Sequence, residues 1–333
     1  MRRVLIAGGA GFFGRLVGEL LRDMGIPSAV AGRSGQIVMD IEDRASLRAA
    51  LRRGDVIVDA AGPFQSRTAA LVEVACDIGA DVIDLNESLV HARRIEALAD
   101  RVRESGIAVF STCSAVSAVA AALLRISGIA RPARLSALVA PASRETAHTG
   151  TLRALLASVG VPVEVWRGGR FVSALGWREA RAFSLPPRRA YLVASALPLT
   201  LPRVWPSLCD VDCWTDTGTP MGNGILALAA RSSALRALAE RALPLGGALA
   251  RMIGTRRGAF AVEIEDETGQ VARLALTAAR RSYLIAAAPA ALAARALAQG
   301  SSRERGIVPV DRQVAADELV AYLGTLGISL VRA

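Results

Sequence analysis

The chain of 333 residues contains no lysine, only two histidines and only four cysteines. All forty basic residues are therefore arginines, and the formal net charge is +10. Without lysine, the protein cannot form a Schiff base through a side chain of its own, and it cannot contain a Tyr-x-x-x-Lys proton relay. The arginines are scattered, with no basic tail and no basic-aromatic array, so we expect no nucleic-acid partner.

Long apolar runs are also missing. The two longest apolar stretches, residues 191–208 and 283–298, are interrupted by prolines before they reach the length of a membrane span. The apolar run at the start is too short for a secretory signal, and glycines follow it at once. We therefore expect a cytoplasmic protein without an integral membrane segment, whose apolar character still allows a peripheral membrane contact.

The four cysteines offer little metal chemistry. Cys76 and Cys113 fall within expected elements of the first domain, where buried, reduced thiols are usual. Cys209 and Cys213 form a C-D-V-D-C pattern that is half of a metal site, but no second pair and no nearby histidine accompanies it. We therefore predict no metal.

Strand and helix patterns alternate through residues 1–130. The expected strands are residues 3–7, 28–32, 36–41, 55–61, 81–85 and 107–112. The expected helices are residues 11–24, 43–53 with Asp43 as N-cap, 66–78, 89–104 and 115–126. This alternation predicts an α/β Rossmann domain with a doubly wound parallel sheet, whose ligand lies at the carboxyl ends of the strands.

The pattern changes after Pro132, where prolines and all four tryptophans accumulate. Residues 259–266 and 270–278 read as two strands joined by a turn, and residues 286–298 and 314–326 read as helices. We predict a second, α+β domain with an antiparallel sheet over residues 131–309. The C-terminal helix within 310–333 is expected to return to the first domain.

The strongest motif is GGAGFFG, which comprises Gly8, Gly9, Ala10, Gly11, Phe12, Phe13 and Gly14. It follows an expected strand and begins an expected helix, the context of a dinucleotide-binding loop. Glycine allows positive φ and close approach of a pyrophosphate, and a helix N-terminus offers unpaired amides and the positive end of its dipole. The alternative is a glycine-rich turn without a ligand.

The end of the second strand indicates which dinucleotide is bound. NAD enzymes usually carry Asp or Glu there, whereas this chain has Arg33 followed by Ser34. Arginine pairs with a 2′-phosphate, so we predict NADP rather than NAD, unless Arg33 is simply a solvated surface residue. Asp40, after the third strand, either contacts the adenine or caps the next helix.

Further loops lie at the same expected edge of the sheet. Ala61, Gly62, Pro63 and Phe64 follow the fourth strand, and Phe64 is placed to flank the nicotinamide ribose. Asn86 and Glu87 follow the fifth strand, and Cys113 and Ser114 follow the sixth. We expect these residues near the nicotinamide end, with ordinary turn chemistry as the alternative for each.

Together, these segments make the chain resemble the saccharopine dehydrogenase-like oxidoreductases. The discriminating parts are the AGPF loop and the downstream C-x-x-G-A-x-x-x-D pattern that begins at Cys76. The tail after residue 286 is similar to the closing segment of that family, whereas residues 133–255 match less clearly. The resemblance implies an NADP-binding Rossmann domain, an α+β domain that pairs subunits in a homodimer, and hydride transfer to or from a small molecule.

The reacting groups are harder to identify. His148 begins an expected helix within a polar patch and is our candidate catalytic residue, with a helix-start histidine as the alternative. His91 is expected to have a surface or helix role, and Tyr191, Tyr283 and residues 214–216 are weaker candidates. The apolar segment 192–208 predicts a partly apolar substrate with a C=N, C=C or C=O bond. The alternatives are an inactive NADP-binding sensor or scaffold and a short-chain dehydrogenase-like reductase.

Overall fold

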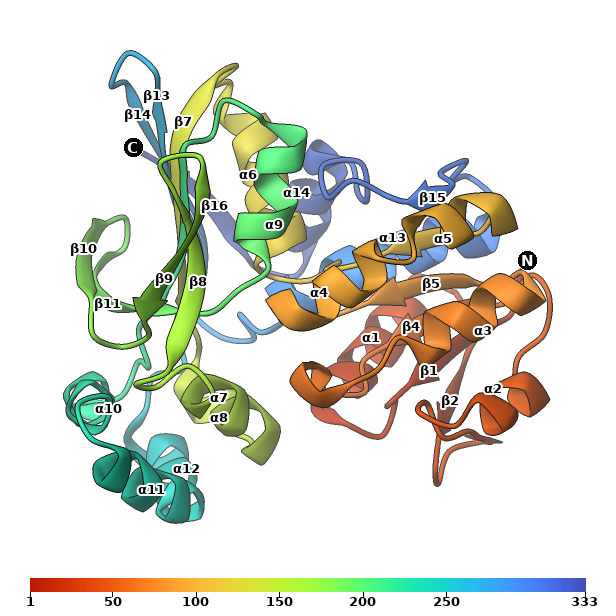
Figure 1. Cartoon of the computed structure of the whole chain (residues 1–333), viewed down its shortest axis with the longest axis horizontal. Helices are drawn as coiled ribbons and strands as arrows, with labels where there is room; N and C mark the ends of the chain where they lie inside the picture. Colours follow the sequence, from red (N-terminus) through yellow and green to blue (C-terminus); the bar gives the residue numbers. More distant parts are fainter. The chain divides into compact units, whose positions relative to one another are not determined.

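The computed structural model describes residues 1–333, apart from the side chain of Thr149. The chain divides into two compact units (Figure 1). Unit 1 comprises Met1–Ala122 and Ala286–Leu319, and unit 2 comprises Leu123–Ile285 and Val320–Ala333. The part of the C-terminal region that belongs to unit 1 is therefore Ala286–Leu319, whereas the sequence predicted residues 310–333.

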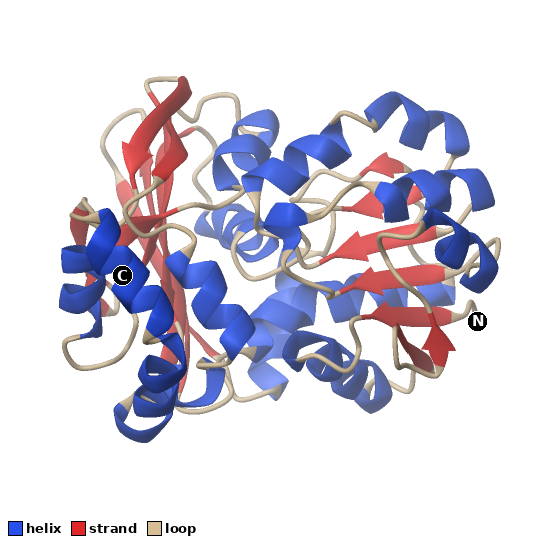
Figure 2. Cartoon of the chain, turned by 60° about the horizontal axis from the view of Figure 1, so that its bottom comes forward, coloured by secondary structure: helices blue, strands red, loops and turns tan.

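Unit 1 is built on a seven-stranded sheet with the order β15-β6-β5-β4-β1-β2-β3, and every pairing in it is parallel (Figure 2). Its strands are β1 (Val4–Ala7), β2 (Ser28–Gly32), β3 (Ile37–Val38), β4 (Val56–Asp59), β5 (Asp81–Asp84), β6 (Ala108–Phe110) and β15 (Gly306–Ile307). The chain winds outward from β1 in one direction and from β4 in the other. In sheets of this type, ligands bind where the order reverses, here between β1 and β4.

Helices cover both faces of this sheet. On one face, Leu5, Ile57 and Val82 join a buried cluster with residues of α2 (Arg44–Ala50), α3 (Ala70–Ile78), α4 (Leu89–Glu96) and α5 (Ala99–Ser105). On the other face, α1 (Phe12–Asp23) lies against Ile6, whose Cδ1 is 3.4 Å from the position that a Cβ at Gly18 would take. Residues of α13 (Leu284–Gln299) lie beside α1, since Arg295 contacts Met24.

Unit 2 contains a nine-stranded sheet with the main order β10-β11-β12-β7-β13-β14-β16, and β8 pairs with β12 and β9. Its strands are β7 (Pro132–Ala140), β8 (Pro162–Arg167), β9 (Arg170–Leu175), β10 (Ala180–Ser184), β11 (Pro187–Val193), β12 (Asp210–Thr215), β13 (Gly258–Asp266), β14 (Val271–Ala278) and β16 (Ser329–Arg332). The β7–β12 pair is parallel and the others are antiparallel.

The helices of unit 2 form two groups. One group comprises α7 (Ser143–Thr146), α8 (Thr149–Leu156), α10 (Gly222–Ala229), α11 (Ser233–Arg241) and α12 (Leu243–Ile253). Within it, α12 packs against α7, α8 and α11, and α11 packs against α10. The helix α9 (Leu197–Val204) packs on β12. The unit boundaries fall within α6 (Ser117–Ser127), α13 and α14 (Ala316–Thr325). None of the helices that the structure describes combines the length and apolar character that a membrane crossing requires.

The predicted fold class is confirmed, and three local details differ. The expected helix 89–104 is two helices, α4 and α5, because the chain turns at Ala97 and Leu98. A seventh strand, β15, extends the parallel sheet, and the predicted antiparallel sheet of unit 2 contains one parallel pair. Asp43 is the N-cap of α2, as predicted, and its side chain accepts a hydrogen bond from the amide of Ala45.

Candidate functional site

The glycine loop between β1 and α1 has no room for side chains at its two ends. Gly8 has φ +71°, and a Cβ atom added there would lie 2.8 Å from Cα of Ala61. At Gly14, an added Cβ would lie 2.3 Å from the carbonyl oxygen of Gly8. Glycine is therefore required at both positions, because each neighbour is backbone that no rotamer change can move.

The same loop presents open amides at the start of α1. Gly11 is the N-cap and provides no side chain to cap the helix. Within the described part of the chain, the amides of Phe13 and Gly14 have no hydrogen-bond acceptor. Such amides and the positive end of the helix dipole together favour an anion such as a pyrophosphate.

The residues after β2 and β3 lie at the surface. Arg33, Ser34 and Asp40 are exposed, and the side chains of Arg33 and Ser34 form no hydrogen bond or ion pair with the described residues. The Asp40 carboxylate accepts a hydrogen bond from the amide of Glu42 at 3.0 Å. Asp40 thus stabilises its own turn and does not cap α2, whereas Arg33 is available to a ligand.

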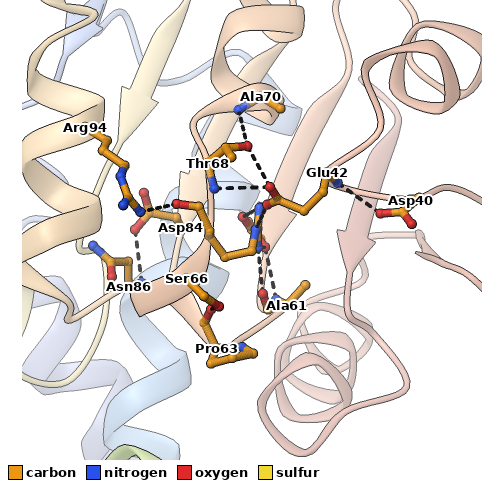
Figure 3. A network of polar contacts seen from close by, with 12 residues as sticks. Asp40, Glu42, Ala61, Pro63, Ser66, Thr68, Ala70, Asp84, Asn86 and Arg94 are labelled. Carbon is orange, nitrogen blue, oxygen red and sulfur yellow. Dashed lines mark hydrogen bonds and ion pairs between the residues drawn. The ribbon is translucent and has the colours of Figure 1, made fainter. Parts of the chain in front are cut away.

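A buried arginine, Arg67, supports the loop Ala61–Phe64, which follows β4. Figure 3 shows the surrounding network of polar contacts, with Glu42, Ala61 and Thr68 labelled. The side chain of Arg67 is only 6% exposed. Its Nη1 donates to the carbonyl oxygen of Ala61 at 2.6 Å, and its Nη2 pairs with Asp59 at 3.1 Å. Its Nε pairs with Glu42, which also accepts hydrogen bonds from the amide and hydroxyl of Thr68.

These contacts engage all three nitrogen atoms of the Arg67 guanidinium with groups of the protein itself. Burial raises the pKa of Asp59, and the Arg67 charge opposes that rise. The guanidinium also lies 5.6 Å from the ring centre of Phe64, and the carbonyl of Arg67 accepts a hydrogen bond from Arg94. Gly62, Pro63 and Phe64 therefore form a fixed loop, with Gly62 and Pro63 exposed and Phe64 half-buried.

A small cavity with both apolar and charged residues in its lining lies behind this loop. It has a volume of about 10 Å³, and its lining includes Asp59, Arg67, Asp84 and His91. One oxygen of Asp84 accepts the amides of Asn86 and Thr112, whereas the Asp84 Oδ2 and His91 Nδ1 atoms have no partner among the described residues. The cavity has room for about one water molecule.

Burial has opposite effects on the two titratable groups that face this cavity. It raises the pKa of Asp84 and lowers the pKa of His91, because it penalises the charged form of each. His91 lies on α4, but its side chain is only 3% exposed and its ring is 5.4 Å from that of Phe64. Of the two predicted roles, at the surface or within the helix, only the helix role is consistent with this burial, since α4 turns His91 toward the sheet.

Glu87 links the loops that follow β5 and β6. Its carboxylate accepts hydrogen bonds from the hydroxyls of Ser114 and Ser117 and from the amides of Val116 and Ser117. It therefore caps the start of α6. Burial raises the pKa of Glu87 to about 7, although these donors favour the ionised form. A group that titrates near neutral pH at this sheet edge is suited to proton transfer.

Asn86 and Cys113, predicted at the same edge, are buried. Both side chains are 0% exposed. The side-chain amide of Asn86 donates a hydrogen bond to the carbonyl oxygen of Ser88 and accepts one from the backbone amide of Ser88. These two hydrogen bonds order the turn before α4. Cys76 and Cys113 are buried free thiols, as predicted, and burial raises the pKa of each.

His148 belongs to unit 2, whereas every predicted cofactor-binding residue belongs to unit 1. It is the half-buried N-cap residue of α8. Tyr191 stacks on Trp177 with ring centres 5.2 Å apart, and Trp214 donates a hydrogen bond to Asp212 at 2.7 Å. These contacts within unit 2 are structural for Tyr191 and Trp214, while the roles of Tyr283 and His148 stay predictions.

The apolar segment 192–208 forms part of the core of unit 2. Leu192, Leu197 and Leu201 are each 0% exposed. In the same unit, Cys209 is exposed and Cys213 is buried. A search of the described residues finds no group of three or more His, Cys, Asp or Glu side chains arranged to hold a metal ion.

The sequence motifs gave no role to Arg67, Asp59, Asp84 or Glu42, although Asp84 ends the C-x-x-G-A-x-x-x-D pattern that begins at Cys76. The only available signal was an acidic residue at the end of an otherwise apolar strand, which occurs in both β4 and β5. An acid in that position must have a partner in the fold. The sequence does not show which of forty arginines supplies it.

Comparison with known proteins identifies the fold. Neither a family model nor a curated protein matches the chain. The structure is similar to apo saccharopine dehydrogenase (L-Glu forming) from Saccharomyces cerevisiae, with a TM-score of 0.63, 13% identity and full coverage of both chains. The WlbA dehydrogenase from Thermus thermophilus, solved with NAD and UDP-GlcNAcA, aligns over 97% of this chain and 94% of its own, with 12% identity and a TM-score of 0.43. The chain thus has the fold of saccharopine dehydrogenase.

Proposed function

We propose that the chain is an NADP(H)-dependent oxidoreductase that transfers a hydride to or from a C=N, C=C or C=O bond of a small metabolite. The observation that carries this proposal is the loop from Gly8 to Gly14, which excludes a Cβ at both ends and opens on unpaired amides. The loop lies where the strand order of a parallel sheet reverses. A backbone segment that cannot carry side chains allows a pyrophosphate to approach its amides closely.

The choice of NADP rests on Arg33 and Ser34. They follow β2 directly, are exposed, and have side chains without a partner in the described structure. An arginine here pairs with a 2′-phosphate, whereas an acidic residue would bind the ribose hydroxyls of NAD. Asp40 accepts a hydrogen bond within its own turn, and its proposed role toward the cofactor is a contact with the adenine edge.

The remaining residues at this edge position the reacting groups. When bound, NADPH supplies the hydride. The loop Ala61–Phe64 adjoins Gly8, and Arg67 fixes it from behind, so Phe64 is held where it can flank the cofactor. Glu87 anchors the neighbouring turns and has a pKa near neutral pH, and His148 stays the candidate catalytic residue.

The substrate is proposed as a class only. The buried leucines of residues 192–208 account for the apolar character of that segment without a substrate. A panel of imines, enals and ketones, with both apolar and carboxylated members, therefore tests the prediction of a partly apolar substrate. Efficient turnover of saccharopine would contradict it. The homodimer and the cytoplasmic location stay predictions.

Two measurements separate the alternatives. Titration of NADPH fluorescence with wild-type protein and with Arg33→Ala tests binding, and tighter binding of NADH than of NADPH by both proteins would refute the cofactor assignment. NADPH oxidation across the substrate panel then distinguishes an enzyme from a sensor or scaffold, which binds without turnover. A short-chain dehydrogenase mechanism is disfavoured because the chain has no lysine for its proton relay.

A further inference from the structure

Exposed large apolar side chains are concentrated in one part of unit 2. Of the fifteen such side chains found among the described residues, nine lie between Met221 and Ile253, in and around α10, α11 and α12. The most exposed are Met221 at 79%, Leu245 at 73% and Met252 at 69%. Figure 1 shows these three helices grouped at one end of the unit. Exposed apolar side chains gathered on neighbouring helices in this way indicate an interaction site.

The helix α12 has the opposite orientation from an ordinary surface helix. Its large residues Leu245, Leu249 and Met252 recur at i, i+4 and i+7 and are exposed, whereas Gly247 and Ala250 are buried. A Cβ at Gly247 would lie 2.7 Å from Leu152 Cδ1 of α8. Because a side chain at Gly247 would displace Leu152, the inward face of α12 favours small residues at this point, and Leu245, Leu249 and Met252 point outward. The outward apolar face is therefore built into the packing of this unit.

The same segment is strongly basic. Residues 221–257 contain six arginines and one acid, Glu240, which gives a net charge of +5 (6 − 1). Glu240 lies 3.9 Å from Arg236. Arg231, Arg241 and Arg256 are exposed, and their side chains form no ion pair with any residue that the structure describes. The partner of this surface must therefore offer apolar area together with negative charge.

We infer that α10, α11 and α12 dock the protein on an anionic lipid surface. The helices contain 8, 9 and 11 residues, so each is too short to span a bilayer but long enough to lie in its interface. Leucines and methionines would enter the acyl boundary while arginines meet the lipid phosphates. A second copy of the chain is disfavoured because a two-fold interface would bring these like charges together.

Flotation with lipid vesicles tests this inference on the full-length protein. Wild type should float with phosphatidylcholine vesicles that contain phosphatidylglycerol, bind much less to phosphatidylcholine alone, and dissociate as NaCl is raised. The double variant Leu245→Gln/Leu249→Gln keeps helix-forming residues but removes apolar area, and it should lower the partition coefficient by roughly tenfold per leucine. Arg231→Gln/Arg241→Gln should lower it by about fivefold per arginine at low salt.

The matched control is Leu175→Gln on β9, whose side chain is 44% exposed outside the docking helices. It should bind vesicles as wild type does. Absence of vesicle binding by wild type, or equal binding by wild type and the double leucine variant, would overturn the inference. So would sedimentation analysis that shows a wild-type dimer converted to monomer by the double leucine variant. Thermal unfolding of every variant confirms that the fold is intact, so the outcome is independent of the proposed function.

Discussion

Replacing Gly14 with alanine tests the cofactor site where its geometry is tightest. The added Cβ would lie 2.3 Å from the carbonyl oxygen of Gly8 and 2.6 Å from Cα of Gly9. Both neighbours belong to the backbone, so the loop itself must move by roughly 1 Å to reach ordinary contact distances. Such overpacking costs about 1–3 kcal/mol of folding stability.

The same movement should weaken NADPH binding. It would shift the amides of Phe13 and Gly14, and each hydrogen bond to a charged group that is lost costs about 1.5–3 kcal/mol. We therefore expect Gly14→Ala to raise the Kd for NADPH by roughly 10- to 100-fold. Fluorescence titration measures this Kd, and thermal unfolding measures the accompanying loss of stability.

Gly18→Ala is the matched control, four residues later in the same helix. Its Cβ would meet Ile6 Cδ1 at 3.4 Å, an ordinary contact, and alanine is favoured over glycine inside a helix by about 0.5–1 kcal/mol. This variant should be at least as stable as wild type and should bind NADPH equally well. If folded Gly14→Ala protein bound NADPH as tightly as Gly18→Ala protein, the assignment of this loop to the pyrophosphate would be refuted.

Three further predictions concern charged residues. Arg33→Ala should raise the Kd for NADPH by about 10-fold or more and leave that for NADH unchanged, because only NADPH carries the 2′-phosphate; equal effects in titrations of both cofactors would contradict this role. Arg67→Met should destabilise the fold by about 3–5 kcal/mol in urea unfolding, because Asp59 is left as a buried unpaired charge, and Asp59→Asn in the same chain should recover part of the loss; strictly additive effects would argue against the pair. Because the pKa of Glu87 is raised from 4.5 to about 7, its contribution to stability is complete below pH 4.5 and is lost as the pH rises through 7, by on the order of 3 kcal/mol. Glu87→Gln should flatten that pH dependence, and an unchanged slope in unfolding measured from pH 4.5 to 7.5 would exclude it.

The features that the sequence predicts are those that depend on local patterns. The glycine spacing and the alternation of buried strands with helices act over a few residues, so the loop, six parallel strands and the cap at Asp43 could all be predicted. The strands of residues 132–215 depend on distant partners instead. The register of β7 against β12 pairs Arg134 with Asp210, about 75 residues apart, and prolines at the starts of β8 and β11 hide their strand character.

The buried polar residues show the same limit at the site. Glu87 was predicted at the sheet edge because it follows an apolar strand, but its capping of α6 could not be foreseen from its position. Asn86 and Cys113 follow strands in the same way, yet both are buried, because the turns after β5 and β6 pack inward. A position at the end of a strand therefore predicts proximity to the site and does not predict exposure to a ligand.

The contacts of Arg67 and Arg33 separate two roles that a simple loss of binding would confuse. All three nitrogen atoms of the Arg67 guanidinium are engaged by Glu42, Ala61 and Asp59, so Arg67 can influence a ligand only through the loop Ala61–Phe64. That loop adjoins Gly8, which serves any dinucleotide. Arg67→Met should therefore weaken NADPH and NADH by the same factor, whereas Arg33→Ala should change the ratio of the two affinities. A change of that ratio in Arg67→Met would mean that Arg67 reaches the ligand directly and that its buried contacts rearrange on binding.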